Sequence, residues 1–367
     1  MTTAAALLAF AVLAPQEPPL AARIDACAQA HMQKDRLPAV SLAIVQHGKE
    51  LLAKAYGLAS IELQAPAQPD TVFAIASVTK VFTATLVAQL VEQQKLSFDQ
   101  SVGELLADLP EAWRKVTVRQ LLSHTSGLPD VIVDPVRGTW LGSTRQEAIA
   151  KASALPLQFP AGTSWSYNQT NYLLLGAIAE KVTGLPFDDV VQQRIVAPLG
   201  LRATTFGDAT VVVPQRATWY TGIDWDGQQP RRSKELHPAF VTYPAFMHTA
   251  AALNTTAREL AAFVEAVASG KVIGGALRDA MWTAVALNDG TTFRLEGTLG
   301  MGLGWMVDDK EHHRAVGGSG GSSVAFRHFV DDKLTVVVLT NLQGHDPDAF
   351  VYELAGLCVP ALAASPR

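Results

Sequence analysis

Apolar residues recur at helical spacing over residues 20–34. The face that they share carries Leu20, Ile24, Cys27 and His31. Two apolar runs follow at 40–45 and 51–56, and the His47-Gly48 turn between them is typical of paired strands. This part of the chain is therefore predicted to form a helix followed by two antiparallel strands.

Helical spacing dominates the middle of the chain. The first long helix is predicted over residues 77–96, and its buried side carries Val78, Val81, Phe82, Leu86, Leu90 and Val91. Further helices are predicted at 117–123, 144–154, 170–183, 186–196 and 257–269. A polar stretch at 216–235 interrupts them, and its Asp226-Gly227 pair predicts a hairpin turn.

Strand-like runs return near the C-terminus, at 303–307, 322–330 and 334–339, and precede a helix predicted over 347–358. The apolar face of this last helix carries Phe350, Leu354, Leu357 and Cys358. Because tight turns join the neighbouring strands, we expect one antiparallel five-stranded sheet, flanked by the N- and C-terminal helices. The predicted fold class is α+β.

This pattern divides the chain into two lobes. Residues 23–75 and 290–367 are expected to form the sheet-and-helix lobe. Residues 76–289 are expected to form an inserted, mainly helical lobe. A cleft between the two lobes is the natural place for a functional site.

The composition narrows the classes of protein. Apolar residues make up 49% of the 367 residues, which supports a large core and excludes disorder over most of the chain. The net charge is 29 − 34 = −5, so no basic excess exists to bind nucleic acid. The two cysteines, Cys27 and Cys358, are too few for a disulfide scaffold.

The N-terminus carries an uncharged apolar run at residues 4–14. Such a run is too short to span a bilayer, which takes ~20 residues, and its length suits the core of a signal peptide. We therefore expect residues 1–22 to direct export, and the mature chain to be periplasmic or secreted without a membrane span. An apolar N-terminal helix that stays attached is the alternative.

The most informative motif is Ser77-Val78-Thr79-Lys80, at the start of the helix predicted over 77–96. A spacing of three places Ser77 Oγ and Lys80 Nζ on one side of a helical turn. The apolar neighbours of Lys80 favour the uncharged amine that a general base needs, and a helix N-terminus favours negative charge at Ser77. Taken alone, the motif is equally consistent with a capping serine and a surface lysine.

Other segments give this motif a context. Tyr167 lies just before a predicted helix in the segment 160–184, and a His-Thr-Ser-Gly turn ends the segment 118–130. A glycine-rich stretch, 316–321, precedes a strand. In this order the segments resemble the serine β-lactamase and penicillin-binding-protein superfamily, in particular its class C-like branch of β-lactamases, D-alanyl peptidases, D-aminopeptidases and esterases. The resemblance covers about residues 36–342 and implies the β-lactamase/transpeptidase-like fold.

The resemblance also implies roles for single residues. Ser77 matches the acylated nucleophile, Lys80 its activating base, and Tyr167 the tyrosine that shuttles the proton. The backbone N–H groups of Ser77 and Gly321 match the oxyanion hole. Substrate-binding positions match Gln169, Gly318, Ser319 and Gly320.

The chain departs from the family pattern at three places. The third residue of the Y-x-N motif is Gln169, and the basic first residue of the K-T-G or H-S-G triplet is replaced by Gly318. An Ala-Gly-Gly-Leu element appears as Ala250-Ala251-Ala252-Leu253. Because Gly318 removes a charge that would orient a carboxylate, we expect neutral short-chain esters to be better substrates than penicillins or D-alanyl peptides.

Three other signals point elsewhere. The stretch 317–321 formally matches G-x-S-x-G around Ser319, with Asp332 and His345 downstream, but a strand follows where an α/β-hydrolase needs a helix. His124, at a helix end, is interpreted as structural. The adjacent His312 and His313 would point to opposite faces of a strand. No H-E-x-x-H or comparable cluster occurs, so neither a metal nor another cofactor is expected.

Two hypotheses follow. The first is an exported, monomeric serine hydrolase that cleaves an ester or amide, in a small molecule or peptide, through an acyl-Ser77 intermediate. The second is a non-catalytic or weakly active binding relative of penicillin-binding proteins, suggested by the changes at Gln169 and Gly318. The family fold would also pack the first and last helices together, so Cys27 and Cys358 either form a disulfide or remain two buried thiols.

Overall fold

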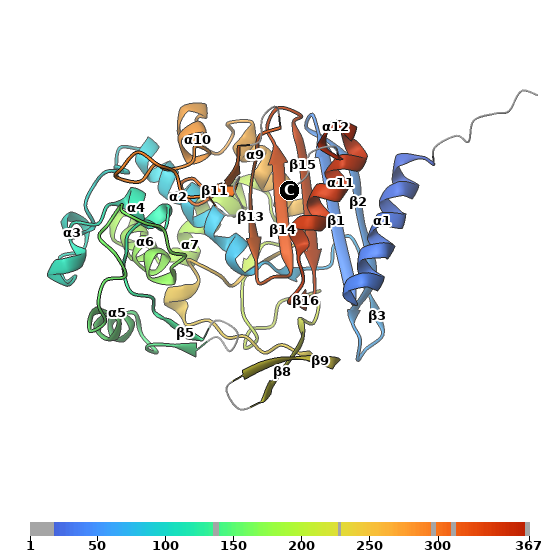
Figure 1. Cartoon of the computed structure of the whole chain (residues 1–367), viewed down its shortest axis with the longest axis horizontal. Coiled ribbons are helices and arrows are strands. Elements are labelled where there is room, and N and C mark those ends of the chain that lie inside the picture. Colours follow the sequence, from blue (N-terminus) through green and yellow to red (C-terminus); the bar gives the residue numbers. More distant parts are fainter. Residues whose placement is uncertain (1–17, 135–138, 227–228, 295–298, 310–312, 364–367) are drawn as a thin grey trace, which may run out of the picture.

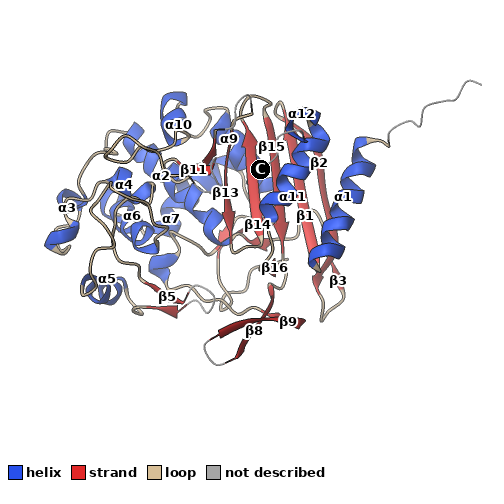
Figure 2. Ribbon diagram, viewed as in Figure 1, coloured by secondary structure: helices blue, strands red, loops and turns tan. Residues whose placement is uncertain are grey.

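The computed structural model describes residues 18–134, 139–226, 229–294, 299–309 and 313–363. A large antiparallel sheet stands between helices from the two chain ends and a mainly helical region formed by the middle of the chain (Figures 1 and 2). Most of the predicted signal segment, residues 1–17, lies outside the described residues, as does His312. None of the helices in the described ranges is long and apolar enough to cross a membrane.

The main sheet has eight strands in its described part, in the order β11-β12-β13-β14-β15-β1-β2-β3. Their bounds are β11 (Leu299–Met301), β12 (Met306–Asp308), β13 (Ala315–Gly320), β14 (Val324–Phe329), β15 (Leu334–Thr340), β1 (Ala39–Gln46), β2 (Lys49–Ser60) and β3 (Ala65–Pro66). Every neighbouring pair is antiparallel. Strands from the two ends of the chain meet where β1 pairs with β15, with Ala43 opposite Val337.

The predicted fold class is confirmed, but the sheet is wider than the five strands expected. The additional strands are β13, which is glycine-rich, and the short edge strands β3 and β11. Glycine has little strand propensity, so the pattern at 316–321 did not indicate a strand. β13 forms because its backbone pairs with β12 on one side and β14 on the other, which its composition does not indicate.

The predicted helices lie within a few residues of their predicted bounds, and four short helices, at 102–105, 197–199, 275–281 and 360–363, were not predicted. Their bounds are α1 (Leu20–Asp35), α2 (Thr79–Glu92), α3 (Val102–Leu105), α4 (Val118–Leu122), α5 (Arg145–Ser153), α6 (Gln169–Thr183), α7 (Phe187–Val191), α8 (Ala197–Leu199), α9 (Ala257–Ala268), α10 (Gly275–Met281), α11 (Pro347–Cys358) and α12 (Pro360–Ala363). Side-chain N-caps begin several of them: Thr117, Thr144, Asn168 and Thr256 each accept a backbone N–H two or three residues into the helix.

The described residues also form three smaller sheets. Their strands are β4 (Phe73–Ala74), β10 (Leu253–Thr255) and β7 (Thr205–Phe206); β16 (Leu342–Gln343), β8 (Tyr220–Asp226) and β9 (Gln229–Pro238); and β5 (Ile132–Asp134) with β6 (Thr139–Trp140). The antiparallel pair β8–β9 confirms the hairpin predicted within 216–235, although its turn lies outside the described residues.

Alternate residues of the central strands enter two separate hydrophobic clusters. In β1, Ala39 and Ala43 join the cluster that contains α2, whereas Val40, Leu42 and Ile44 join the cluster under α1 and α11. Because helices cover both faces, both sets are buried, and the strand appears in the sequence as a continuous apolar run. We call the α2 side the inner face of the sheet and the α1–α11 side the outer face.

On the outer face, α1 and α11 lie side by side, as the family resemblance implied (Figure 1). The Arg23 guanidinium donates a hydrogen bond of 2.7 Å to the Leu357 carbonyl. Cys27 and Cys358 are both free thiols, so of the two alternatives the disulfide is not formed. Cys27 is directed instead toward Glu353, one turn earlier on α11 than Cys358.

Candidate active site

Ser77 lies in a tight turn between a short strand and the central helix of the inner face. The 3₁₀ turn Ala76–Val78 connects β4 to α2, and Ala76 adopts a positive φ of 42°. A positive φ is unfavourable for a residue with a Cβ, so the packing around the turn must hold it there. This turn leaves Ser77 half-buried at the N-terminal end of α2, facing a cavity.

Lys80 is buried because α2, which carries it, is buried on nearly all sides. Its side chain is only 3% exposed. Nζ lies 3.3 Å from Ser77 Oγ and donates a hydrogen bond of 3.0 Å to the Ala250 carbonyl. Within the described residues no carboxylate forms an ion pair with Lys80, which leaves its nitrogen directed at the candidate nucleophile.

Two tyrosine rings flank the Lys80 amine. Nζ lies 4.9 Å from the ring centroid of Tyr167 and 5.1 Å from that of Tyr172. Tyr172 is fully buried, and burial raises the pKa of its phenol well above the usual range, so it stays protonated. Tyr167 is 40% exposed at the cavity, which makes it the tyrosine that a substrate can reach.

His124 holds the loop that carries Tyr167. Its Nδ1 accepts hydrogen bonds from the Asn168 backbone N–H at 3.1 Å and from the Asn171 side chain at 3.2 Å. Burial, with the nearby charge of Lys80, keeps the pKa of His124 well below its usual range, so the ring is neutral. The ring packs against that of Tyr167 with centroids 4.6 Å apart, a contact that fits the structural role predicted for His124.

The glycine-rich end of β13 comes unusually close to the turn of Ser77. A Cβ on Gly320 would lie 2.4 Å from the Ile75 carbonyl oxygen and 2.9 Å from the Ser77 nitrogen, so only glycine fits there. Gly321 has a φ of 59° and lies against Trp219. In the part of the chain that the structure describes, its N–H has no hydrogen-bond acceptor, as an oxyanion-hole donor requires.

These residues line one cavity of about 490 Å³, a size that suits a small ligand. The cavity brings together most of the site residues predicted from the sequence: Ser77, Lys80, Tyr167, Gly318, Ser319, Gly320 and Gly321. Gln169 does not line it; it begins α6, and its backbone N–H donates to Asp130 at 3.0 Å. Trp165 and Phe293, stacked with centroids 4.5 Å apart, add an apolar wall.

Carboxylates lie at the end of the cavity formed by α11. Asp346 and Asp348 line it at the start of that helix. Asp348 accepts a hydrogen bond of 2.7 Å from Ser319 and pairs with Arg327 at 2.5 Å. Arg327 is 1% exposed, and its guanidinium is already paired with Asp348. No sequence motif marks Asp346 or Asp348, so neither was predicted as a site residue.

Gly318 faces the helical side of the cavity. A Cβ there would lie 3.2 Å from the Phe326 ring and 3.5 Å from a Val81 methyl group, so a side chain is accommodated if the ring gives slightly. With glycine at position 318, the basic side chains among the described residues that line the cavity are Lys80 and His345.

The residues of the alternative G-x-S-x-G motif do not assemble into a triad. Ser319 bonds to Asp348, Asp332 pairs with His313 at 3.2 Å, and His345 bonds to Thr340. After Ser319 the chain turns back into β14 instead of entering a helix. These contacts remove the α/β-hydrolase interpretation.

The sequence matches the model of the Beta-lactamase family over residues 24–357, and the chain belongs to that family. It is 32% identical over 267 residues to a Beta-lactamase of Lysobacter lactamgenus, covering 71% of this chain and 64% of the relative. It is 32% identical to Esterase EstB of Burkholderia gladioli, with 52% of each covered. The chain spans about half to two thirds of the length of the curated relatives it matches.

Solved structures show the same fold. D-amino acid amidase from Ochrobactrum anthropi SV3 superposes with a TM-score of 0.79 at 23% identity, covering 94% of this chain and 99% of the amidase. The octameric penicillin-binding protein homologue from Pyrococcus abyssi superposes with a TM-score of 0.77 at 24% identity, covering 93% and 77%. The curated relatives include a β-lactamase and an esterase, so the family contains hydrolases.

Proposed function

We propose that the protein hydrolyses an ester or amide through a covalent acyl-Ser77 intermediate, with Lys80 and Tyr167 as the proton-transferring bases. The observation that carries this proposal is the short contact of 3.3 Å between Lys80 Nζ and Ser77 Oγ, with the Tyr167 ring beside the same amine. A nucleophile needs a base within reach, and both groups face the cavity.

In this mechanism Ser77 Oγ bonds to the carbonyl carbon of the substrate while its proton passes to the Lys80–Tyr167 pair. The negative charge that develops on the carbonyl oxygen is stabilised by the N–H groups of Ser77 and Gly321. The proton is then delivered to the leaving alcohol or amine as its bond to carbon breaks. Water attacks the acyl group in the same way, releases the acid and restores Ser77.

The preferred substrate is a neutral or cationic acyl compound with a short chain. Gly318 supplies no positive charge, and the Asp346 carboxylate at the other end of the cavity disfavours an anion, whereas the charge of Asp348 is compensated by Arg327. A substrate carboxylate would therefore have no cationic partner apart from the Lys80 amine, which the mechanism uses as a base, since Arg327 is already paired with Asp348. The esterase and amidase relatives are compatible with this preference.

Labelling with a fluorescent fluorophosphonate, followed by intact mass measurement, tests the proposal. The wild-type chain should gain one adduct, located by peptide mapping to Ser77. Ser77→Ala should lose both the adduct and the hydrolysis of p-nitrophenyl acetate while keeping its circular dichroism and melting temperature. Ser319→Ala is the matched control because this serine lines the same cavity. An adduct on Ser319, or none on the folded wild-type chain, would contradict the mechanism and favour a binding relative.

Export and a monomeric state are parts of the same proposal. Export is supported by the apolar run at residues 4–14. Expression of the full chain, with fractionation and N-terminal mass analysis, should recover a periplasmic or secreted form that lacks about residues 1–22. Light scattering should give the mass of one chain; an octamer, as in the Pyrococcus abyssi homologue, would contradict it.

A further inference from the structure

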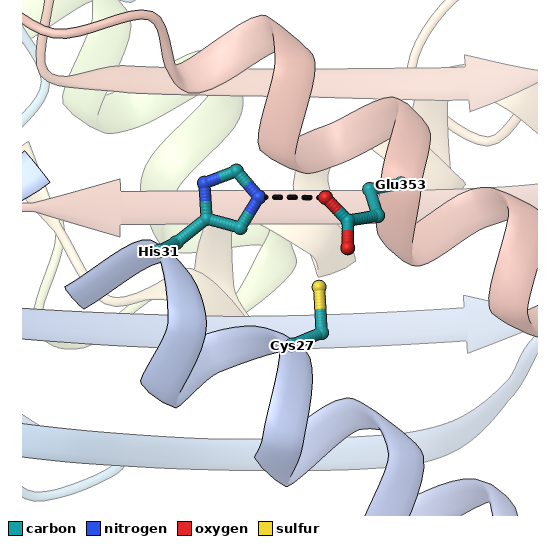
Figure 3. A group of neighbouring side chains, drawn as sticks. All are labelled: Cys27, His31 and Glu353. Atoms are coloured by element: carbon teal, nitrogen blue, oxygen red, sulfur yellow. Dashed lines mark hydrogen bonds and ion pairs between the residues drawn. The ribbon is translucent and has the colours of Figure 1, made fainter. Parts of the chain in front are cut away.

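Three metal-binding side chain types meet on the outer face of the sheet, between the first and last long helices. Cys27 and His31 extend from α1, and Glu353 extends from α11 toward them (Figure 3). One ligand atom of each residue lies within 4.8 Å of the others. His31 Nε2 and Glu353 Oε2 are 2.9 Å apart. The cluster lies across the sheet from the candidate active site.

The local geometry directs these atoms to one point. Cys27 and His31 are four residues apart on a helix, so their side chains lie on one face. Phe350 of α11 stacks on the His31 ring with centroids 4.0 Å apart, which fixes the plane of the imidazole. With bond lengths near ~2.1 Å and tetrahedral angles, a metal ion bound to Nε2 and Oε2 would hold these atoms ~3.4 Å apart. The present distance of 2.9 Å would therefore increase by only about half an ångström.

The surroundings favour a cation. Asp35 Oδ2 lies 3.7 Å from His31 Nδ1, where it can orient the ring as carboxylates do behind metal-binding histidines. Asp35 and Glu353 together bring two negative charges to the cluster. Glu353 is 56% exposed, which gives an ion a path from solvent, whereas the side chain of His31 is only 7% exposed.

We propose that Cys27, His31 and Glu353 form a binding site for a divalent transition metal, best suited to Zn²⁺, that joins α1 to α11. The mixed sulfur, nitrogen and oxygen donor set is one that Zn²⁺ accepts, and a solvent molecule completes four-coordination on the exposed side. On binding, the Cys27 thiol releases its proton to solvent and becomes the thiolate ligand. The site has a structural effect, because it ties the N-terminal helix to the C-terminal one.

A reactive Cys-His-Glu triad is the competing interpretation of these residues. The burial of the thiol and the orientation of His31 argue against it. Cys27 is 6% exposed, so no substrate reaches its sulfur. His31 points its Nε2 at Glu353 and not at the sulfur.

Titration of the chelator-treated, reduced protein with Co²⁺ tests the site, because cobalt reports its ligands in its absorption spectrum. The wild-type chain should show a thiolate-to-cobalt charge-transfer band and tetrahedral d–d bands, both removed by stoichiometric Zn²⁺. Cys27→Ser should lose the charge-transfer band. Cys358→Ser is the matched control and should keep it, since that thiol is free and outside the cluster.

Glu353→Gln keeps the test valid if Cys27→Ser fails to fold, since an exposed position tolerates this change. It should weaken Zn²⁺ binding at least ~10-fold, and Asp35→Asn should weaken it ~10-fold to ~100-fold by releasing the His31 ring. Zn²⁺ should also raise the melting temperature of the wild-type chain in proportion to the logarithm of its concentration. The absence of a charge-transfer band in the wild-type protein, or equal binding by Glu353→Gln, would overturn the proposal. Neither result depends on hydrolase activity.

Discussion

The two faces of the main sheet bury chemically active side chains in different ways. On the inner face, Ser77 and Lys80 come from one helical turn, and the lysine is held by a carbonyl group and two aromatic rings. On the outer face, Cys27 and His31 also come from one helical turn, but Glu353 completes the group from the far end of the chain. The inner group opens into a cavity, whereas the outer group lies between two packed helices.

This difference distinguishes two roles of buried polar groups, catalysis and the binding of an ion. A cavity beside Ser77 leaves room for a substrate, so the inner group suits chemistry that turns over. The outer group lies between two packed helices, so it suits a permanently bound ion with a structural role. The following changes test the comparison, starting with those that should have the largest effects.

Removing the candidate bases should disrupt the inner face most strongly. Lys80→Met keeps the volume of the side chain, and Tyr167→Phe keeps the ring, so both should fold. Each should lower the acylation rate by ~10²-fold or more, the usual scale for loss of a general base. Pre-steady-state release of p-nitrophenol measures this rate. Undiminished rates in both variants would remove the proposed roles of Lys80 and Tyr167, whatever the status of Ser77.

A substitution at Gly320 tests the close contact between β13 and the turn of Ser77 without changing the candidate bases. Gly320→Ala would place a methyl group 2.4 Å from the Ile75 carbonyl oxygen, so the strand must move away from Ser77. A displacement of about 1 Å at the reacting centre costs on the order of 10²-fold in kcat/KM. Gly275→Ala is the control, since a Cβ there meets nothing closer than 3.6 Å. Equal activity of the two variants would show that the contact with β13 does not position the site.

Restoring a positive charge at position 318 should sharpen the substrate preference. The native protein should favour a neutral ester over a cephalosporin, and Gly318→Lys should narrow the ratio of their kcat/KM values by roughly tenfold or more, as a charged hydrogen bond would. Gly318→Ala measures the steric cost of the Cβ near Phe326 without the charge. If the native protein already prefers the cephalosporin, another cation binds its carboxylate.

The smallest expected effect concerns the stability of the loop held by His124. Because the pKa of His124 is well below 6.5 in the folded chain, the unfolded chain binds the extra proton as the pH falls below that value. The free energy of unfolding should therefore decrease with acidification, by up to ~1.4 kcal/mol per pH unit from this group.

His124→Asn keeps an acceptor and tolerates the φ of 60°, and it should flatten the decrease between pH 7 and pH 5. His47→Asn is the control: His47 has a φ of 50° but is exposed. Urea unfolding at several pH values gives the slopes. Parallel curves for wild type and His124→Asn would show that another group carries the dependence.

Much of the inner face could be predicted from the sequence, because its features are local. The spacing of Ser77 and Lys80 fixes their shared side of a helical turn, and the segments around Tyr167 and Gly321 carried the family resemblance. The apolar pattern likewise predicted most helices within a few residues of their observed bounds. These signals depend on residues near one another in the chain.

The remaining features depend on distant parts of the chain. Glu353 meets His31 across 322 positions, and no local pattern signals that contact. The glycine-rich sequence of β13 does not indicate a strand, and β13 forms because it pairs with the neighbouring strands. The acidic end of the cavity depends on the position at which α11 begins. Gln169 shows the converse: it stands at a motif position, yet the turn into α6 directs it away from the cavity lining.

The pairing of β1 with β15 has a consequence for the order in which the chain can fold during synthesis. The hairpin of β1 and β2 is made early, but one edge of β1 has its partner only in residues 334–340. A ribosome-bound chain must therefore keep an apolar strand edge unpaired until residues 334–340 have emerged. Completion of the sheet therefore waits for a segment about 290 residues later in the chain than β1, and during that interval the open edge of β1 is exposed to wrong pairing.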